Sequence, residues 1–238
     1  MADESNASDI YRSGEYRVRH PDWHEADAPF KARHIFEMLQ RHPFPIATIA
    51  EIGCGSGAVL AELSRRLPDV SFFGFDVAPA AIEIARKFES ERVHFELREL
   101  DQFAGQTFDL AMMIDVFEHV PDYLGFLRQA RPLAKRFIFH IPLDLHMQGL
   151  WRDAQIDARD GLGHLHYFSE ATALRTLEDT GYRVLATQFT AGALQIRSWK
   201  RALAAAPRWA LFQLSPGLAA KFLGGFSLLV LAEPQREP

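Results

Sequence analysis

The sequence predicts an α/β fold built on a doubly wound parallel sheet, and three observations lead to that prediction. Short apolar segments alternate along the chain with segments whose apolar residues recur at helical spacing. A glycine-rich turn at residues 53–57 joins one such strand to the helix that follows it. Residues 108–114 are apolar on both faces, which is typical of a strand in the middle of a parallel sheet. This alternation predicts helices on both faces of one sheet.

The individual elements follow from local signals in chain order. Pro43 and Pro45 end a first helix, at 30–41, and Pro79 begins a helix at 79–88. Further helices are expected from residue 58, at 122–131 and at 169–179, the last capped by Ser169 with Thr172. Gly181 ends that helix. The expected strands are 49–52, 70–75, 92–97, 108–114, 136–141, 182–190 and 226–232. Residues 143–168 are expected to be a long functional loop.

Composition limits the classes of protein to consider. With 238 residues, 48% of them apolar, the chain can bury a full core. The net charge of -5 argues against general nucleic-acid binding. Cys54 is the single cysteine, so no intramolecular disulfide forms, which fits a reducing compartment. The polar N-terminus is not typical of a signal peptide, and no apolar run approaches about 20 residues. We therefore expect a cytoplasmic protein.

The glycine turn is the strongest indication of a ligand site. Glycines at alternate positions let the backbone approach a ligand closely, and the next helix points its N-terminal dipole toward that ligand. Gly53, Gly55 and Ala58 satisfy a dinucleotide-binding pattern, with Asp76 near the position of its ribose-binding acid. Glu51, in contrast, is placed to reach the amino group of a zwitterionic ligand. A nicotinamide-dependent oxidoreductase thus remains an alternative.

A second motif favours another class of ligand. The sequence 108–120, FDLAMMIDVFEHV, follows the glycine turn downstream. Together the two motifs resemble those of the class I S-adenosylmethionine (SAM) methyltransferases, over residues 45–190. The resemblance implies a Rossmann-like methyltransferase fold with strand order 3-2-1-4-5-7-6, the seventh strand antiparallel. It also implies two regions: an N-terminal extension at 1–45 over the cofactor site, and a SAM-binding domain at 46–238.

The same resemblance implies which residues hold SAM. Asp76 would accept hydrogen bonds from both ribose hydroxyls, although an N-cap role has the same geometry. An acid after the third strand would accept from the adenine amino group, with Glu99 expected there and Asp101 the alternative. Tyr16, or Tyr11, would contact the methionine carboxylate. The expected cofactor-binding residues are Glu51, Gly53, Cys54, Gly55, Gly57, Asp76, Val77, Glu99, Leu100, Asp115 and Tyr16.

The segment Asp115-x-x-Glu118-His119 indicates where chemistry takes place. It is similar to the E-x-x-E-H motif of ubiquinone-biosynthesis O-methyltransferases and small-RNA 2′-O-methyltransferases, and 163–169 resembles the segment that supplies their further histidine. The resemblance implies a divalent ion such as Mg²⁺ held by Asp115, Glu118, His119 and His164. Without a metal, His119 or His164 would serve as a general base, with Glu118 bracing the loop.

Residues 192–224 form a second region of interest, predicted to be a helical cap. They contain five cations and no acid: Arg197, Lys200, Arg201, Arg208 and Lys221. Three interpretations remain open: a lid over the acceptor pocket, a cap that includes a homodimer contact, and an interfacial helix on anionic lipid.

We therefore predict SAM-dependent methyl transfer to a hydroxyl of a small molecule or saccharide, with anionic and lipid-linked acceptors both open. Besides the oxidoreductase, the alternatives are a metal-dependent 2′-O-methyltransferase of small RNA and a non-catalytic SAM-binding module. The acidic net charge counts against RNA.

Overall fold

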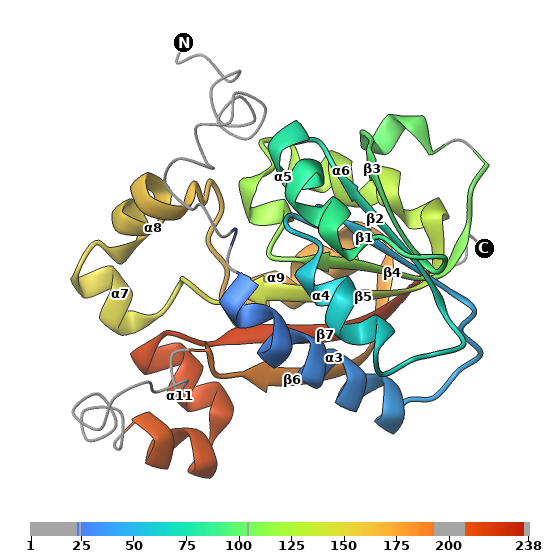
Figure 1. Cartoon of the computed structure of the whole chain (residues 1–238). Coiled ribbons are helices and arrows are strands. Elements are labelled where there is room, and N and C mark those ends of the chain that lie inside the picture. Colours follow the sequence, from blue (N-terminus) through green and yellow to red (C-terminus); the bar gives the residue numbers. More distant parts are fainter. Residues whose placement is uncertain (1–22, 24, 104, 193–207, 236–238) are drawn as a thin grey trace.

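The computed structural model describes residues 23, 25–103, 105–192 and 208–235. These residues form a seven-stranded sheet with the order β3-β2-β1-β4-β5-β7-β6 (Figure 1). Its strands are β1 Thr48–Ile52, β2 Ser71–Asp76, β3 Val93–Leu97, β4 Phe108–Ile114, β5 Ala134–Pro142, β6 Tyr182–Thr190 and β7 Ser227–Pro234. β7 runs antiparallel to both β5 and β6, whereas the other neighbours are parallel. The predicted strand order and the reversal of the seventh strand are confirmed.

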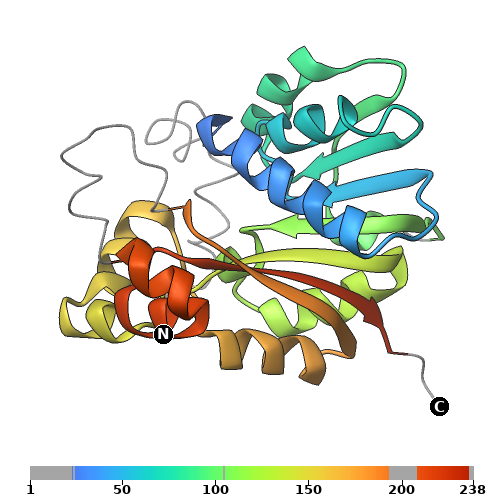
Figure 2. The ribbon, with the colours of Figure 1, turned by 90° about the horizontal axis from the view of Figure 1, so that it is seen from below.

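Helices cover both faces of this sheet, as Figure 2 shows. The helices are α3 Ala28–Arg41, α4 Ala58–Ser64, α5 Pro79–Ala85, α6 Tyr123–Ala130, α7 Met147–Trp151, α8 Ala154–Leu162, α9 Glu170–Asp179 and α11 Pro216–Leu223. Residues 208–214 are also helical. Helices α3, α4 and α5 pack into one apolar core, and α6, α9 and α11 pack into the other.

The central strand β4 contributes to both cores. Leu110 and Met112 belong to the core under α3 and α4, while Ala111 and Met113 belong to the opposite one. All four side chains are fully buried. The prediction that this strand is apolar on both faces is confirmed, because a strand in mid-sheet must match a hydrophobic layer on each side.

The prediction of a long loop at 143–168 is wrong, because this segment contains α7 and α8. The side chain of His146 caps α7 by accepting from the Gly149 backbone N–H at 2.9 Å. Gly163, with a φ of 82°, ends α8. Both helices are short and leave most of their side chains exposed, so their sequences lack the apolar stripe that signals a helix.

The predicted cap at 192–224 lies only partly within the described residues, because 193–207 fall outside them. Helix α11 contributes Ala219 and Ala220 to the core shared with α6 and α9. No helix in the described part of the chain combines the length and the apolar character needed to cross a bilayer.

The glycine turn between β1 and α4 depends on close packing beneath it. Gly53, Gly55 and Gly57 all have positive φ angles, of 74°, 52° and 74°. A Cβ added to Gly57 would lie 2.5 Å from the ring of Phe95 and 3.0 Å from the Cβ of Ala85. The third glycine therefore lets β3 and α5 pack against the turn, which sets the position of the other two.

We expect Gly57→Ala to destabilise the protein by about 2–5 kcal/mol. The left-handed backbone costs roughly 1–2 kcal/mol and overpacking against Phe95 roughly 1–3 kcal/mol. Gly105→Ala is the matched control, since Gly105 has a φ of 81° but nothing within 4 Å of an added Cβ. The measurement is the free energy of unfolding from urea denaturation. Equal losses in the two variants would contradict the packing role of Gly57.

Candidate functional site

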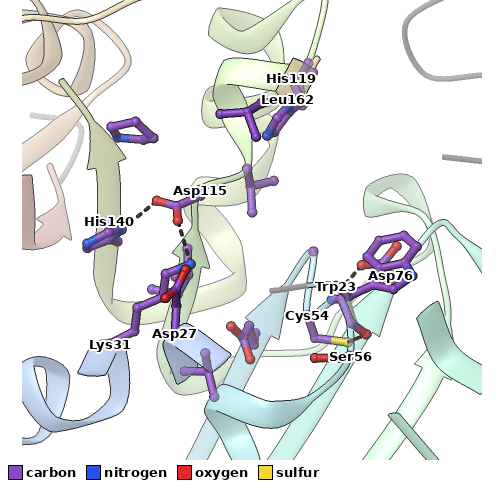
Figure 3. Close-up of a pocket in the computed structure, with 18 of the residues that line it drawn as sticks. Trp23, Asp27, Lys31, Cys54, Ser56, Asp76, Asp115, His119, His140 and Leu162 are labelled. Atoms are coloured by element: carbon purple, nitrogen blue, oxygen red, sulfur yellow. Dashed lines mark hydrogen bonds and ion pairs between the residues drawn. The ribbon is translucent and has the colours of Figure 1, made fainter. Parts of the chain in front are cut away.

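A cavity of about 840 Å³ opens at the carboxyl ends of β1, β2, β4 and β5 (Figure 3). Ligands bind at this edge in open α/β sheets, because the helix N-termini and the strand ends meet there. Nine residues predicted to hold the cofactor line the cavity: Glu51, Gly53, Cys54, Gly55, Asp76, Val77, Glu99, Leu100 and Asp115. Gly57 instead supports the turn from behind, and Tyr11 and Tyr16 lie outside the described residues.

Asp76, at the end of β2, has its carboxylate fixed by backbone donors. One oxygen accepts from the Gly55 N–H at 2.8 Å and the other from the Ala78 N–H at 2.9 Å. Burial raises the pKa of Asp76, and these hydrogen bonds offset part of that rise. The carboxylate thus ties the glycine turn to the segment before α5. Its donors differ from those of an N-cap side chain, which bonds inside the first turn of a helix.

Two acidic residues after β3, Glu99 and Asp101, are both candidates to accept from the adenine amino group. Glu99 caps the short helix Leu100–Gln102, exchanging hydrogen bonds with the backbone and side chain of Gln102. Asp101 lines the cavity as well. Part of the hydrogen-bonding capacity of Glu99 is therefore used locally, and the structure leaves both acids within the cavity wall.

Glu51, in β1, is a buried carboxyl group with one unpartnered oxygen. Its side chain is 2% exposed, and Oε2 has no hydrogen-bond partner. Burial raises the pKa of Glu51 to about 8, although the charge of Lys31 opposes the shift. The carboxyl group is consequently neutral at pH 7 in the free protein.

A chain of polar contacts crosses the cavity from α3 to β6. The ammonium of Lys31 lies 2.7 Å from Oδ2 of Asp115, directly after β4. Nδ1–H of His140, on β5, donates to Oδ1 of Asp115 at 2.5 Å, and its Nε2 lies 2.9 Å from Oγ1 of Thr190. Figure 3 shows Lys31, Asp115 and His140 together on one side of the cavity, away from Asp76.

This chain holds Asp115 as a carboxylate. Burial by itself would raise the pKa of Asp115, but His140 and Lys31 outweigh it and bring the pKa well below its usual range. Burial also acts to lower the pKa of Lys31, and Asp115 reverses that shift. The backbone of Asp115 has a φ of 56°, a left-handed conformation that aspartate tolerates better than most residues.

Three residues with ligand chemistry meet beside a second part of the cavity, where His119 and His164 line it and Glu118 is buried next to them. Glu118, His119 and His164 each offer an atom within 4.8 Å of the others. The backbone assembles them, since the carbonyl oxygen of Glu118 accepts from the N–H groups of Leu165 and His166 at 2.8 and 3.1 Å. Asp115 was predicted to join this group, but the structure pairs it with Lys31 and His140 instead.

Both imidazoles are oriented by hydrogen bonds at Nδ1. His119 donates to the carbonyl oxygen of Gly163 at 3.1 Å, and His164 donates to the carboxylate of Asp144 at 2.5 Å. Burial and the neighbouring His164 lower the pKa of His119 to about 4, so its ring is neutral at pH 7. With the proton on Nδ1, the Nε2 of His119 presents a lone pair 3.9 Å from Glu118.

Glu118 completes this group with a carboxyl whose two oxygens have no hydrogen-bond partner in the described structure. Burial, with a further contribution from Asp115, raises the pKa of Glu118 well above its ordinary value. Glu118 thus offers carboxyl oxygens beside two imidazoles, and each imidazole is oriented through Nδ1 by a carbonyl or a carboxylate. This combination matches the ligands of a divalent transition metal or Mg²⁺. The three residues therefore fit a cation.

Lys31 and Trp23 line the cavity but were not predicted as site residues, and the sequence favours His140, which also lines it, only as an ordinary strand-end histidine. Lys31 lies four positions before Ile35 and so shares the buried face of α3, a signal that was available. His140 interrupts the apolar run of β5, where a polar residue is unexpected. Trp23 gave no signal; its ring lies 3.6 Å from where a Cβ on Gly55 would be.

Comparison with known proteins places this site in a family. A family described as a methyltransferase domain matches residues 23–187 of the chain. The chain belongs to that family. The predicted membership of the class I SAM-dependent methyltransferases and the predicted fold are confirmed.

Individual relatives agree with this assignment. The methyltransferase is 27% identical over 125 residues to the ubiquinone biosynthesis O-methyltransferase of Xanthomonas campestris pv. campestris (strain B100), covering 48% of this chain and 52% of that one. It is 32% identical over 116 residues to the protein of the same name from Methylobacterium sp. (strain 4-46), covering 43% and 46%. The chain thus spans about half the length of the curated relatives it matches.

Solved structures share the fold. The magnesium protoporphyrin IX methyltransferase of Synechocystis PCC 6803, solved with bound S-adenosylhomocysteine (SAH), superposes with a TM-score of 0.62. The superposition covers 97% of this chain and 98% of that one, at 16% identity. At this identity the likeness extends to the fold alone.

We expect SAH binding to release protons between pH 6 and 7.5. The neutral Glu51 must ionise to bind the cationic amino group that it is predicted to meet, because its pKa in the free protein is about 8. The affinity should therefore fall by up to roughly tenfold for each pH unit below 8. Calorimetry in buffers of different ionisation enthalpy measures the proton release. Glu51→Gln should bind weakly and release none, and a release unchanged in this variant would assign the protons to another group.

Proposed function

We propose that this methyltransferase transfers the methyl group of SAM to a hydroxyl group of a small molecule or saccharide. One observation carries the proposal: a single cavity is lined by the buried acids at the ends of β1 and β2 and by His119 and His164, which meet the buried Glu118. The first set suits a nucleoside with a zwitterionic tail. The second suits an acceptor that must lose a proton.

The nucleoside would lie along β2 and β3. Asp76 accepts from the Gly55 N–H on one oxygen and from the Ala78 N–H on the other, and the Val77 N–H also acts on the carboxylate. A carboxylate offers about four acceptor sites, so capacity remains for a ribose hydroxyl. Val77 is 38% exposed beside it and offers an apolar surface to the adenine ring. Glu99 or Asp101 would accept from the adenine amino group. When bound, SAM supplies the activated methyl group and its leaving group.

The methionine end would lie between two opposite charges. Glu51 suits the amino group, and we assign the carboxylate to Lys31, because the ammonium retains donors beyond the one that Asp115 uses. Lys31 would pair with the carboxylate of the methionine end, and its ion pair with Asp115 holds the ammonium in place. Pairing both tail charges inside a buried site compensates for their desolvation.

We expect Lys31→Met to weaken SAH binding by about 10- to 100-fold, since a charge-assisted hydrogen bond contributes roughly 1.5–3 kcal/mol. The decarboxylated analogue of SAH should bind both proteins with similar affinity. Arg33→Met is the matched control, because Arg33 is an exposed cation of the same helix. Calorimetry gives the dissociation constants. Equal losses of affinity for SAH and for the decarboxylated analogue would contradict the assignment of the cofactor carboxylate to Lys31.

The acceptor hydroxyl would meet the Glu118, His119 and His164 group. Without a cation, His119, which is neutral at pH 7, would accept the hydroxyl proton at Nε2, while Asp144 steadies His164. With a cation, the same nitrogen would be a metal ligand instead. We assign a divalent cation to Glu118, His119 and His164, without Asp115. Such a cation, when bound, lowers the pKa of an acceptor hydroxyl and orients it. The protein itself holds the two imidazoles, which line the cavity, close to the buried carboxyl group of Glu118.

We expect elemental analysis of the protein, dialysed against Mg²⁺ or Mn²⁺ buffer, to find close to one equivalent of metal. Glu118→Gln keeps the shape of the side chain but removes the charge, so this variant should retain none. Asp144→Asn should lower the metal affinity by about 10- to 100-fold through His164. Asp101→Asn, at the other end of the cavity, is the control with unchanged metal. Metal in Glu118→Gln equal to the wild type would rule out this site.

Oxygen is favoured as the methyl acceptor because both curated relatives named above are O-methyltransferases. A small-RNA acceptor has less support, since the net charge is -5. A nicotinamide-dependent oxidoreductase has less support too, because the family match is to methyltransferases. Turnover with any acceptor, detected as SAH formation, would exclude a non-catalytic module.

A further inference from the structure

Exposed apolar side chains gather at one end of the molecule. Of the eleven large hydrophobic residues exposed in the described structure, seven lie on α7 or within residues 208–223. Trp151 is 92% exposed and Leu214 is 84% exposed. The seven are Met147, Leu150, Trp151, Trp209, Leu214, Leu218 and Phe222. Such a concentration marks an interaction surface, whereas single exposed apolar residues are ordinary.

These segments form one structural unit. The guanidinium of Arg208 donates to the carbonyl oxygen of Leu223 at 3.0 Å and to Oε1 of Gln148, on α7, at 3.4 Å. The ring of His146, which caps α7, lies against Gly224, where an added Cβ would approach it to 2.1 Å. Figures 1 and 2 both show α7 beside α11. We call α7 together with residues 208–223 the helical platform.

The charge of the helical platform is of one sign. Residues 147–151 and 208–223 contain Arg208 and Lys221 and no acidic residue, in a protein whose net charge is -5, and Arg152 directly follows α7, before Asp153. Arg152 and Lys221 are exposed beside the apolar side chains. In sequence, 193–207 adds three cations and no acid. Exposed tryptophan and leucine flanked by cations suit the boundary between anionic headgroups and acyl chains.

The helical platform also adjoins the cavity. Asp144, which lines the cavity, precedes α7 by three residues, and Ser227, also in the lining, follows α11 by four. A lipid surface in contact with the platform would therefore lie beside the mouth of the cavity. Helix α8, on the far side of α7, carries the exposed acids Asp157 and Asp160 and bounds the cationic region.

We propose that the helical platform docks on the surface of an anionic lipid bilayer. Its short helices lie in the interface, with Trp151 and Leu214 entering the acyl boundary and Arg152 and Lys221 meeting the headgroups. This docking stands independently of the methyl-transfer reaction, because it needs neither the cofactor nor an acceptor.

The test is sedimentation of the full-length protein with vesicles. We expect the protein to bind vesicles of phosphatidylcholine mixed with phosphatidylglycerol, and to bind phosphatidylcholine alone more weakly. High salt should reduce binding to the anionic vesicles, because salt screens the cations. The double variant Trp151→Ser, Leu214→Ser should lose at least about 100-fold in partitioning, because both apolar side chains that enter the acyl boundary are removed.

Leu97→Ser is the matched control, because Leu97 is 50% exposed at the end of β3, outside the platform. This variant should bind vesicles like the wild type. No binding of the wild type to anionic vesicles, or an equal loss in Leu97→Ser, would overturn the proposal. A dimer in light scattering that the double variant dissociates, without vesicle binding, would overturn it too and assign the platform to a second copy. Calorimetry with SAH on the same variants separates this outcome from a failure of the proposed function.

Discussion

The burial of several carboxyl groups around one cavity is the constraint on which the rest of this site depends. The strand order places β2, β1 and β4 side by side, so Asp76, Glu51 and Asp115 meet at neighbouring strand ends. Three charges cannot be desolvated together without compensation. Asp76 is compensated by backbone N–H groups and Asp115 by Lys31 and His140, while Glu51 holds a proton. The free protein thus holds one protonated carboxyl group, which is the group that we propose for the amino group of the cofactor.

Glu118 presents the same physical problem, buried next to His119 and His164 at the other end of the cavity. Its carboxyl group is 1% exposed and has no hydrogen-bond partner in the described structure, a cost that native proteins seldom retain without use. The adjacent imidazoles of His119 and His164 are both held by acceptors at Nδ1, which turns their other nitrogens into acceptors or ligands. A cation or an acceptor hydroxyl would give the Glu118 oxygens a partner. The burial that leaves Glu118 without a hydrogen bond is therefore also the basis of the proposed chemistry.

The helical platform lies outside the sheet. Solved methyltransferases share nearly the whole length of this chain at 13–16% identity, which reflects the common sheet and its helices. The helical platform is built from short helices with many exposed side chains. The few buried residues of α11 pack into the core shared with α6 and α9. Such elements can vary without disturbing the sheet, and they adjoin the cavity where an acceptor must enter.

Local sequence patterns determined the strands, the glycine turn, Asp76 and Glu51, because each depends on residues close together in the chain. The resemblance to a family added the antiparallel seventh strand. Only the tertiary structure decided the partners of Asp115, since Lys31 and His140 reach it from a distant helix and a neighbouring strand. It also decided the helices α7 and α8, which lack a strong apolar period; α7 forms where Gly224 packs against His146 and Arg208 donates to Gln148. Contacts between segments distant in sequence are set by the packing of the whole sheet, and local periodicity carries no information about them.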